Sequence, residues 1–102
     1  MQIRKTRWSK VYESAEEELM ELFDAKHVEA RRWEGDDGEE IADRQFADDT
    51  QLWCAEGQLL CTIQNKTYSL QPGDVLDVPA GTVATIRVGF GGCAVYESMA
   101  AA

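Results

Sequence analysis

The sequence places two tight turns around one short apolar strand in the stretch Leu70-Gln71-Pro72-Gly73-Asp74-Val75-Leu76-Asp77-Val78-Pro79-Ala80-Gly81-Thr82. Gly73 can take the positive φ that the first turn needs, and Asp74 can accept backbone N–H groups within that turn. Pro79 ends the strand because it has no N–H to donate to a neighbour, and Gly81 permits the second turn. This pattern predicts a strand over residues 75–78 in a small barrel.

Short apolar or alternating runs recur on both sides of this stretch, separated by turn residues. The predicted strands cover residues 27–33, 41–46, 52–55, 59–63, 67–70, 75–78, 83–88 and 93–97. Ahead of them, apolar residues at helical spacing predict one short α-helix over about residues 15–25, with Ser14 and Glu17 as a capping box. Many short strands after a single helix are typical of an all-β sandwich or barrel. A chain of 102 residues has the length of one such domain, spanning residues 1–102.

The stretch quoted above resembles the second conserved motif of the cupin superfamily, which runs G-D-x4-P-x-G-x2-H and here begins at Gly73. The glycine-turn end of the first cupin motif is similar to the run Glu56-Gly57, Leu59, Cys61 and Ile63. The resemblance covers roughly residues 40–97, more than half of the chain. It implies a double-stranded β-helix, a jelly-roll barrel of antiparallel strands with one open mouth, over about residues 27–97.

In the cupin family the chemistry belongs to a metal held by two histidines and a glutamate from the first motif and a histidine from the second. Here the position of the second-motif histidine is Ala84, and that of the glutamate is Thr50. According to the length of the preceding loop, the paired-histidine positions are Asp43 and Gln45 or Arg44 and Phe46. The single histidine of the chain, His27, lies outside both motifs. Because transition metals in such barrels need several imidazole or carboxylate ligands at one point, we expect no metal centre and no cofactor.

Strand alternation predicts which side chains face the inside of this barrel. The resemblance implies that Thr50 and Ala84 face inward. Because side chains alternate along a strand, every second residue from each of them should also face inward, and Trp53 should face outward. The resulting interior is apolar and carries soft sulfur groups. The predicted pocket-lining residues are Arg44, Phe46, Thr50, Leu52, Cys54, Cys61, Ile63, Ala84 and Ile86.

The three cysteines fit two interpretations. Cys54, Cys61 and Cys93 can be reduced thiols in the core, because free cysteine packs as a small apolar side chain. Alternatively, Cys54 and Cys61, which we place on adjoining strand segments, can meet across the barrel as a redox pair or as half of a zinc site. An odd number of cysteines, in a chain whose start shows no secretion signal, favours reduced thiols and a cytoplasmic protein.

Two further groups of side chains are candidates for ligand binding. The run Arg31-Arg32-Trp33 can clamp a carboxylate or an aromatic ligand, although alternation turns only one arginine of the pair inward. The acids Asp43, Asp48 and Asp49 can hold a hard cation or can form a solvated loop, and their spacing is not that of a calcium loop.

The charge of the chain limits its partners. Ten basic and 19 acidic residues give a formal net charge of −9. This argues against a nucleic-acid-binding protein, because such proteins need a basic surface. The basic stretch within residues 1–10 is interpreted as an edge strand or tail, with an anion-binding arm as the alternative. No apolar run approaches the length that spans a membrane, so no membrane partner is expected.

These observations predict a small cupin that lacks the usual metal site. We expect a non-catalytic protein that binds a small, mostly apolar molecule in the barrel, or a dimeric accessory protein. The alternative is a divergent metal-dependent enzyme, such as an oxygenase, an isomerase or a sugar-modifying enzyme, with ligands such as Cys54, Cys61 or Asp43. A homodimer is expected from the resemblance and from an exposed aromatic patch formed by Trp8, Trp33 and Trp53.

Overall fold

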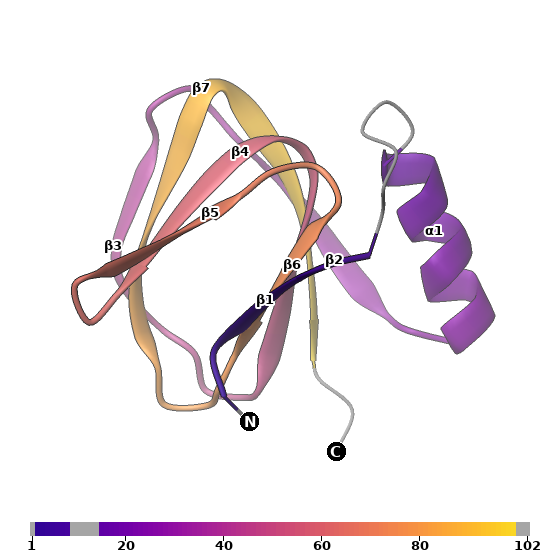
Figure 1. Cartoon of the computed structure of the whole chain (residues 1–102), viewed down its shortest axis with the longest axis horizontal. Helices are drawn as coiled ribbons and strands as arrows, with labels where there is room; N and C mark the ends of the chain where they lie inside the picture. The colour runs from indigo at the N-terminus through magenta and orange to yellow at the C-terminus, as the bar shows by residue number, and fades with distance from the viewer. Residues whose placement is uncertain (1, 9–14, 100–102) are drawn as a thin grey trace.

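The computed structural model describes residues 2–8 and 15–99, and in it one helix stands beside a folded set of antiparallel strands (Figure 1). The elements in chain order are β1 (Arg4–Arg7), α1 (Ala15–Lys26), β2 (Ala30–Gly35), β3 (Glu40–Gln45), β4 (Thr50–Ile63), β5 (Lys66–Leu70), β6 (Asp74–Val78) and β7 (Val83–Met99). The predicted all-β fold with one short helix is confirmed. Ser14, the expected helix cap, lies outside the described residues. None of the helical residues described forms a helix long and apolar enough to cross a membrane.

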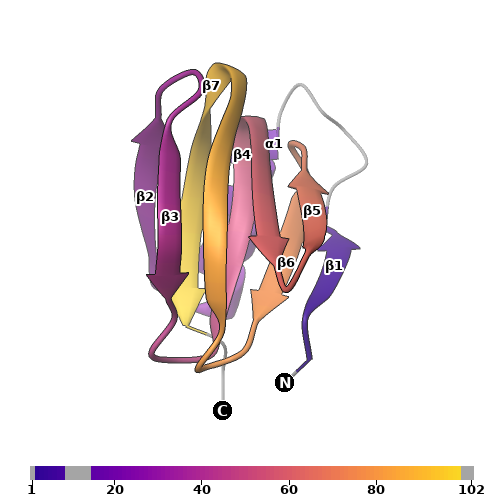
Figure 2. The same cartoon turned by 90° about the vertical axis from the view of Figure 1, so that its left-hand side faces the viewer.

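The two longest strands organise the sheet. β4 and β7 pair antiparallel along most of their length, from Thr50 opposite Met99 to Thr62 opposite Thr85. On the other edge of β7, β3 pairs with the first half and β2 with the second half. On the other edge of β4, β6 pairs with the first half and β5 with the second half. The strands therefore form two half-sheets that share β4 and β7 (Figure 2).

Glycines form a crease between the half-sheets. The register of β4 against β7 shifts on both sides of Glu56 and Gly57, where the strands bend over the top of the molecule (Figure 1). Gly57 and Gly92 have φ values of 73° and 89°. A Cβ atom on Gly57 would lie 2.0 Å from the carbonyl oxygen of Gly92, so only glycine fits this close approach. The breaks that we expected near residues 56–58 and 89–92 are thus wrong; they are bends within the continuous strands β4 and β7.

Each face of the sheet buries its own core. Between the half-sheets lies a cluster of aliphatic and sulfur side chains, including Leu52, Cys61 and Ile86. On the outer face, α1 packs Leu19 and Phe23 against residues of β4, β6 and β7. Docking on the sheet accounts for the persistence of a helix of 12 residues, which would be marginal alone.

The turns that enclose β6 have the geometry that their residues predict. Gly73 and Gly81 have φ values of 99° and 86°. The carboxylate of Asp74 accepts the backbone N–H of Gln71 at 2.9 Å and a guanidinium N–H of Arg7 at 2.8 Å. Arg7 belongs to β1, which pairs with β6, so the basic start of the chain is an edge strand. After α1, the left-handed His27, with a φ of 54°, turns the chain, and β2 begins at Ala30 rather than at the predicted residue 27.

Candidate functional site

The open side of the barrel carries a hollow between the half-sheets. Among the described strands, β2 and β3 both pair with β7 and not with each other, so their inward side chains border a gap. The hollow measures about 470 Å³ and is lined by Arg31, Arg32, Trp33, Ile41, Arg44 and Glu97. We call it the mouth hollow. Strand β2 supplies Arg31 and Trp33, strand β3 supplies Arg44, and the end of β7 supplies Glu97.

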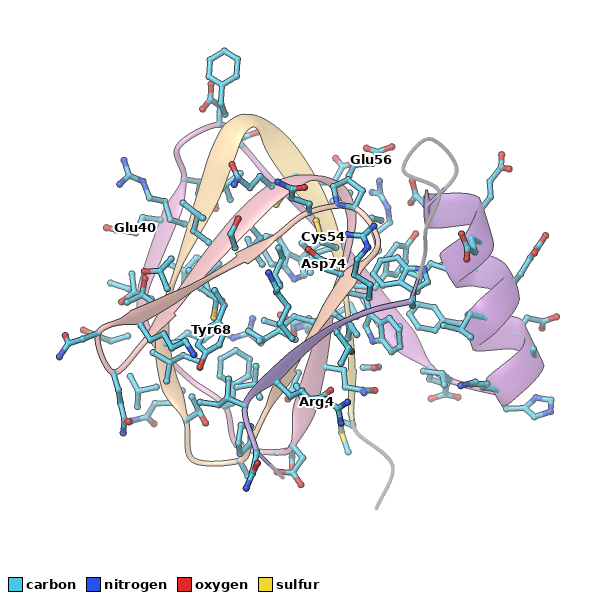
Figure 3. All side chains as sticks on the ribbon, in the orientation of Figure 1. Arg4, Glu40, Cys54, Glu56, Tyr68 and Asp74 are labelled. Carbon is cyan, nitrogen blue, oxygen red and sulfur yellow. The ribbon has the colours of Figure 1, made fainter. Side chains whose placement is uncertain are left out.

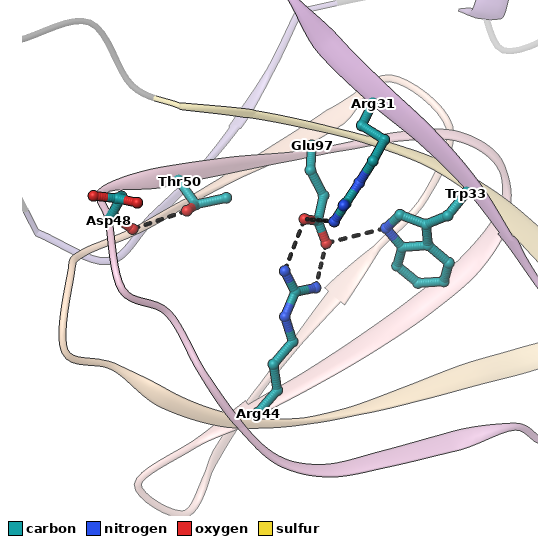
Figure 4. Close-up of polar contacts among 6 residues, drawn as sticks. All are labelled: Arg31, Trp33, Arg44, Asp48, Thr50 and Glu97. Carbon is teal, nitrogen blue, oxygen red and sulfur yellow. Dashed lines mark hydrogen bonds and ion pairs between the residues drawn. The ribbon is translucent and has the colours of Figure 1, made fainter.

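Glu97 is the centre of the polar contacts in the mouth hollow (Figure 4). Its carboxylate accepts one hydrogen bond from each terminal nitrogen of Arg44, so the two side chains form a bidentate ion pair. It also accepts the indole N–H of Trp33 at 3.1 Å and a longer contact from Arg31 at 3.5 Å. Only 9% of the Glu97 side chain is exposed. Such a two-pronged, partly buried contact is stronger and more directional than a surface ion pair.

The contacts keep both partners charged. Burial alone would raise the pKa of Glu97, but the hydrogen bonds and positive charge of Arg44 outweigh it and hold the pKa of this carboxyl below its usual range. The hydrogen bond to Glu97 raises the pKa of Arg44 against the opposing effect of burial. Arg31 and Arg44 bring two positive charges to one carboxylate, so these three groups carry one uncompensated positive charge.

The structure resolves which residues of β3 face inward. Arg44 reaches Glu97, and its guanidinium lies 4.5 Å above the ring of the buried Phe46, a cation–π contact. Asp43 and Gln45 are exposed. The register of β3 shifts between Ile41 and Arg44, and Asp43 has a φ of 51° at this bulge. Of the two alternatives for the paired-histidine positions, Arg44 and Phe46 are therefore the inward pair.

The residues at the expected ligand positions do not fit a metal ion. Arg44 is a cation, Phe46 and Ala84 have no donor atom, and the hydroxyl of Thr50 donates to the carbonyl of Asp48 at 2.8 Å. Within residues 2–8 and 15–99, no three His, Cys, Asp or Glu side chains lie close enough together to hold an ion. The three acids Asp43, Asp48 and Asp49 are thus not a cation site, and Asp49 accepts the backbone N–H of Ala80 at 2.8 Å.

The other predicted pocket-lining residues fill the barrel. They form part of one packed cluster: Phe46, Leu52, Cys54, Cys61, Ile63, Ala84 and Ile86. Four of them, Leu52, Cys54, Cys61 and Ile86, have no exposed surface at all. A ligand at the centre of the barrel would therefore have to displace side chains from a close-packed interior. Arg44 and Thr50 are half-buried nearer the surface. Binding of an apolar molecule in this interior stays a prediction.

The cysteines are three free thiols in different surroundings. Burial, together with the nearby Cys93 and Asp74, raises the pKa of Cys54 to about 12. Burial also raises the pKa of Cys61 to about 11, although Arg44 opposes it. Figure 3 shows Cys54 and Asp74 near the crease, and Tyr68, the cross-strand partner of Cys61, lies farther down the barrel. Because burial raises the pKa of both thiols, neither has the depressed pKa of an activated cysteine nucleophile.

The expected exposed patch of tryptophans does not form. Trp53 does face outward, but α1 covers it and leaves it only 8% exposed. Its ring makes edge contacts with Trp8 and Phe23, at centroid distances of 5.6 Å and 5.1 Å. Trp33 packs on the opposite side of the sheet, against the inner core. The homodimer that we expected would therefore need a different surface.

Glu97 is the central residue that the sequence analysis missed. It follows Cys93 and Val95 on the inward face of β7, at the alternating spacing that places Tyr96 under α1. Extending the same alternation from Val95 to Glu97 would have predicted that Glu97 faces inward. A buried carboxylate there would need hydrogen-bonding or charged partners. Arg31, from the run singled out as a clamp, is one of those partners, and Arg32 turns outward to bind Glu16 of α1.

Comparison with known proteins gives likenesses of structure alone. No family model and no curated protein matches the sequence. A DUF861 family protein from Thermotoga maritima superposes with a TM-score of 0.68 at 18% identity, covering 97% of this chain and 100% of that one. A cupin superfamily protein from Desulfitobacterium hafniense gives 0.64 at 18% identity, covering 96% of this chain and 76% of that one. The cupin domain of Schizosaccharomyces pombe Cnp3 gives 0.64 at 17% identity, covering 100% of this chain and 66% of that one.

Proposed function

We propose that this chain, which has the cupin fold, binds a small organic carboxylate directly in the mouth hollow, without a metal ion. The observation that carries the proposal is Arg44, a fixed guanidinium at a position where the cupin resemblance expects a metal-ligating histidine. A carboxylate ligand would meet a permanent positive charge there, since arginine stays protonated at any physiological pH.

The donors in the mouth hollow support an anionic ligand. A guanidinium has five N–H groups. Arg44 gives two hydrogen bonds to Glu97, which leaves donors for a second acceptor. The side chain of Arg31 is 78% exposed and makes one long contact, so turning it toward a ligand breaks little. Although the chain is acidic overall, Arg31 and Arg44 outnumber the single carboxylate of Glu97 in the hollow. This local excess of positive charge favours anions that reach the hollow.

The walls of the hollow favour a ligand with an apolar body. The indole of Trp33 and the half-exposed side chain of Ile41 border the same space as the two arginines. An aryl or alkyl carboxylate could therefore place its charge on Arg31 and Arg44 and its body on Trp33. This ligand is more polar than the apolar molecule expected from the sequence, and it binds at the mouth rather than in the filled interior.

The test is calorimetric titration with phenylacetate, compared with the neutral phenylacetamide. We expect saturable binding of the acid and none of the amide. We expect Arg31→Gln to weaken binding about tenfold, because it removes a charge-assisted hydrogen bond. Arg87→Gln, at an exposed arginine of β7 outside the hollow, should bind like the wild type. Equal binding of acid and amide, or unchanged affinity in Arg31→Gln, would refute the proposal.

The alternative function, a divergent metal-dependent enzyme, predicts a different result. Its ligands would have to come from residues that the described structure does not bring together. Elemental analysis of protein washed with a chelator separates the two. Near-stoichiometric iron, zinc, manganese or nickel would favour the enzyme, and metal far below one ion per chain would favour the proposed carboxylate site.

A further inference from the structure

A second hollow adjoins the mouth hollow, and the two share Arg31 and Glu97 as lining residues. This second hollow, which we call the acidic hollow, measures about 580 Å³, and its lining also includes Glu29, Asp48 and Thr50. Figure 4 shows Asp48 on one side of Glu97 and Trp33 on the other. A ligand held at Arg31 therefore borders both hollows at once.

The charge of the lining reverses from one hollow to the other. The mouth hollow sets Arg31 and Arg44 against the single carboxylate of Glu97. In the acidic hollow, Glu29 and Asp48 are exposed, and no hydrogen bond or ion pair to another described residue occupies either carboxylate. The two hollows together are therefore matched to a ligand that carries both a negative and a positive group.

The position of Glu97 also favours a positive group on the ligand. Arg44 uses both of its terminal nitrogens to hold this carboxylate. A ligand carboxylate that takes the remaining donors of Arg44 lies close to the carboxylate of Glu97, and the two negative charges repel each other. An ammonium on the adjacent carbon of the ligand can face Glu97 and offset this repulsion.

The acids of the acidic hollow suit an ammonium better than a metal ion. In the part of the chain that the structure describes, no three His, Cys, Asp or Glu side chains come together closely enough to hold a metal. An ammonium has three N–H donors and needs no fixed coordination shell, so carboxylates spread around a hollow are sufficient. Glu97, Asp48 and Glu29 supply such acceptors.

We propose that the ligand of these two hollows is an α-amino acid with an apolar side chain. Its carboxylate binds Arg31 and Arg44, and its ammonium faces the acidic hollow. Its side chain lies on the apolar wall formed by Trp33 and Ile41. In an α-amino acid these three groups leave one carbon atom in different directions, which matches three regions that meet at Glu97. This inference rests on the proposed carboxylate site and adds the ammonium to it.

The test is calorimetric titration with L-phenylalanine and with 3-phenylpropanoate, which has the same carboxylate and the same apolar body but no ammonium. We expect phenylalanine to bind at least about fivefold more tightly, because its ammonium gains charge-assisted contacts with the acids. D-phenylalanine should differ in affinity from the L enantiomer, since exchange of two groups on the central carbon misplaces one of the three contacts.

The double variant Glu29→Gln with Asp48→Asn separates the acidic hollow from the rest of the site. It should weaken the binding of L-phenylalanine about fivefold, because it removes two negative charges, and it should not weaken that of 3-phenylpropanoate. Glu40→Gln is the matched control, because Glu40 is an exposed carboxyl of β3 that borders neither hollow. The control should bind both compounds like the wild type.

The outcomes distinguish this inference from the carboxylate site on which it rests. If 3-phenylpropanoate binds at least as tightly as phenylalanine, the inference is overturned and the carboxylate site stands. The same conclusion follows if both enantiomers bind equally, or if the double variant leaves phenylalanine unchanged or weakens both compounds alike. If neither these compounds nor phenylacetate bind, both proposals fail.

Discussion

The two faces of strand β2 carry similar side chains but use them differently. On the inner face, Arg31 and Trp33 contact one carboxylate, Glu97, which Arg44 also grips. On the outer face, the carboxylate is Glu16 of α1, which accepts Arg32 at 2.8 Å and the hydroxyl of Tyr96 at 2.7 Å. Each face thus combines an arginine of β2, an aromatic donor and a carboxylate from another element.

The difference lies in the balance of charge and in what covers each network. The outer network sets one arginine against Glu16 and Glu34, and α1 lies over the aromatic residues beside it. The inner network sets two arginines against one carboxylate and borders an open hollow. The outer arrangement therefore holds an element of the fold in place, whereas the inner one retains the positive charge that the proposed carboxylate ligand would need.

The largest expected effect tests whether packing holds α1 on the outer face. Phe23 is 6% exposed and makes edge contacts with the rings of Trp53 and Tyr96, at 5.1 Å and 5.8 Å. We expect Phe23→Ala to lower the free energy of unfolding in urea by about 4 kcal/mol. Phe90, on the crease, is 93% exposed, so Phe90→Ala should change it by less than about 0.5 kcal/mol. Equal effects of the two substitutions would show that α1 is not docked.

The next effect compares the two carboxylates directly. Glu97→Gln removes the negative charge between two guanidiniums in a largely buried site, and we expect a loss of about 3 kcal/mol in the free energy of unfolding. Glu16→Gln removes a more exposed carboxylate, with an expected loss of about 1 kcal/mol. Urea unfolding at neutral pH measures both. A larger loss of unfolding free energy in Glu16→Gln than in Glu97→Gln would contradict this expectation, because it would show that the outer network contributes more to stability than the inner one.

The smallest effect is in the pH dependence of stability. The carboxyls of Glu97 and Glu16 both have a pKa below the usual glutamate value. For Glu97, Arg44 outweighs burial, and for Glu16 the hydrogen bonds from Tyr96 and Arg32 are the main cause. A carboxyl whose pKa falls on folding adds stability above its unfolded pKa, and this stability is lost as the pH falls through the folded pKa. We therefore expect unfolding free energy to decline below the usual glutamate pKa.

Single variants separate the two contributions to that decline. Glu97→Gln should flatten the decline more than Glu16→Gln does, because its carboxylate is less exposed to solvent. Glu40→Gln, at an exposed carboxyl of β3, should leave the profile unchanged. The measurement is urea unfolding at a series of acidic pH values. A wild-type profile that stays flat there would contradict the assignment for both residues.

Local rules account for much of the fold. The turn residues from Pro72 to Gly81 have the φ values and hydrogen bonds that their chemistry requires, and alternation placed Leu52 and Ile86 inside and Trp53 outside. The continuity of β4 and β7 could not be predicted in this way. Glycine can end a strand or bend it, and only the contact between Gly57 and Gly92, far apart in sequence, decides which.

The candidate site was harder to predict for a similar reason. Arg44 could be told from Asp43 only after the bulge in β3 fixed the phase of the strand, and a bulge depends on pairing with β7. Glu97 was within reach of alternation, but its partners Arg31 and Arg44 come from strands that meet only in the folded barrel. Burial of the predicted interior could not be read from the sequence, since it depends on how the half-sheets close.

The central place of β7 has a consequence for synthesis on the ribosome. The hairpin of β4 and β5, closed by Gln64 and Asn65 with φ values of 50° and 67°, joins neighbours in sequence and can form early. Strands β2, β3 and β4, in contrast, each pair with β7, the last of the described strands, and cannot form these pairings until β7 has been synthesised. A nascent chain therefore emerges with several unpaired strands, and release before residue 83 would leave them open to aggregation.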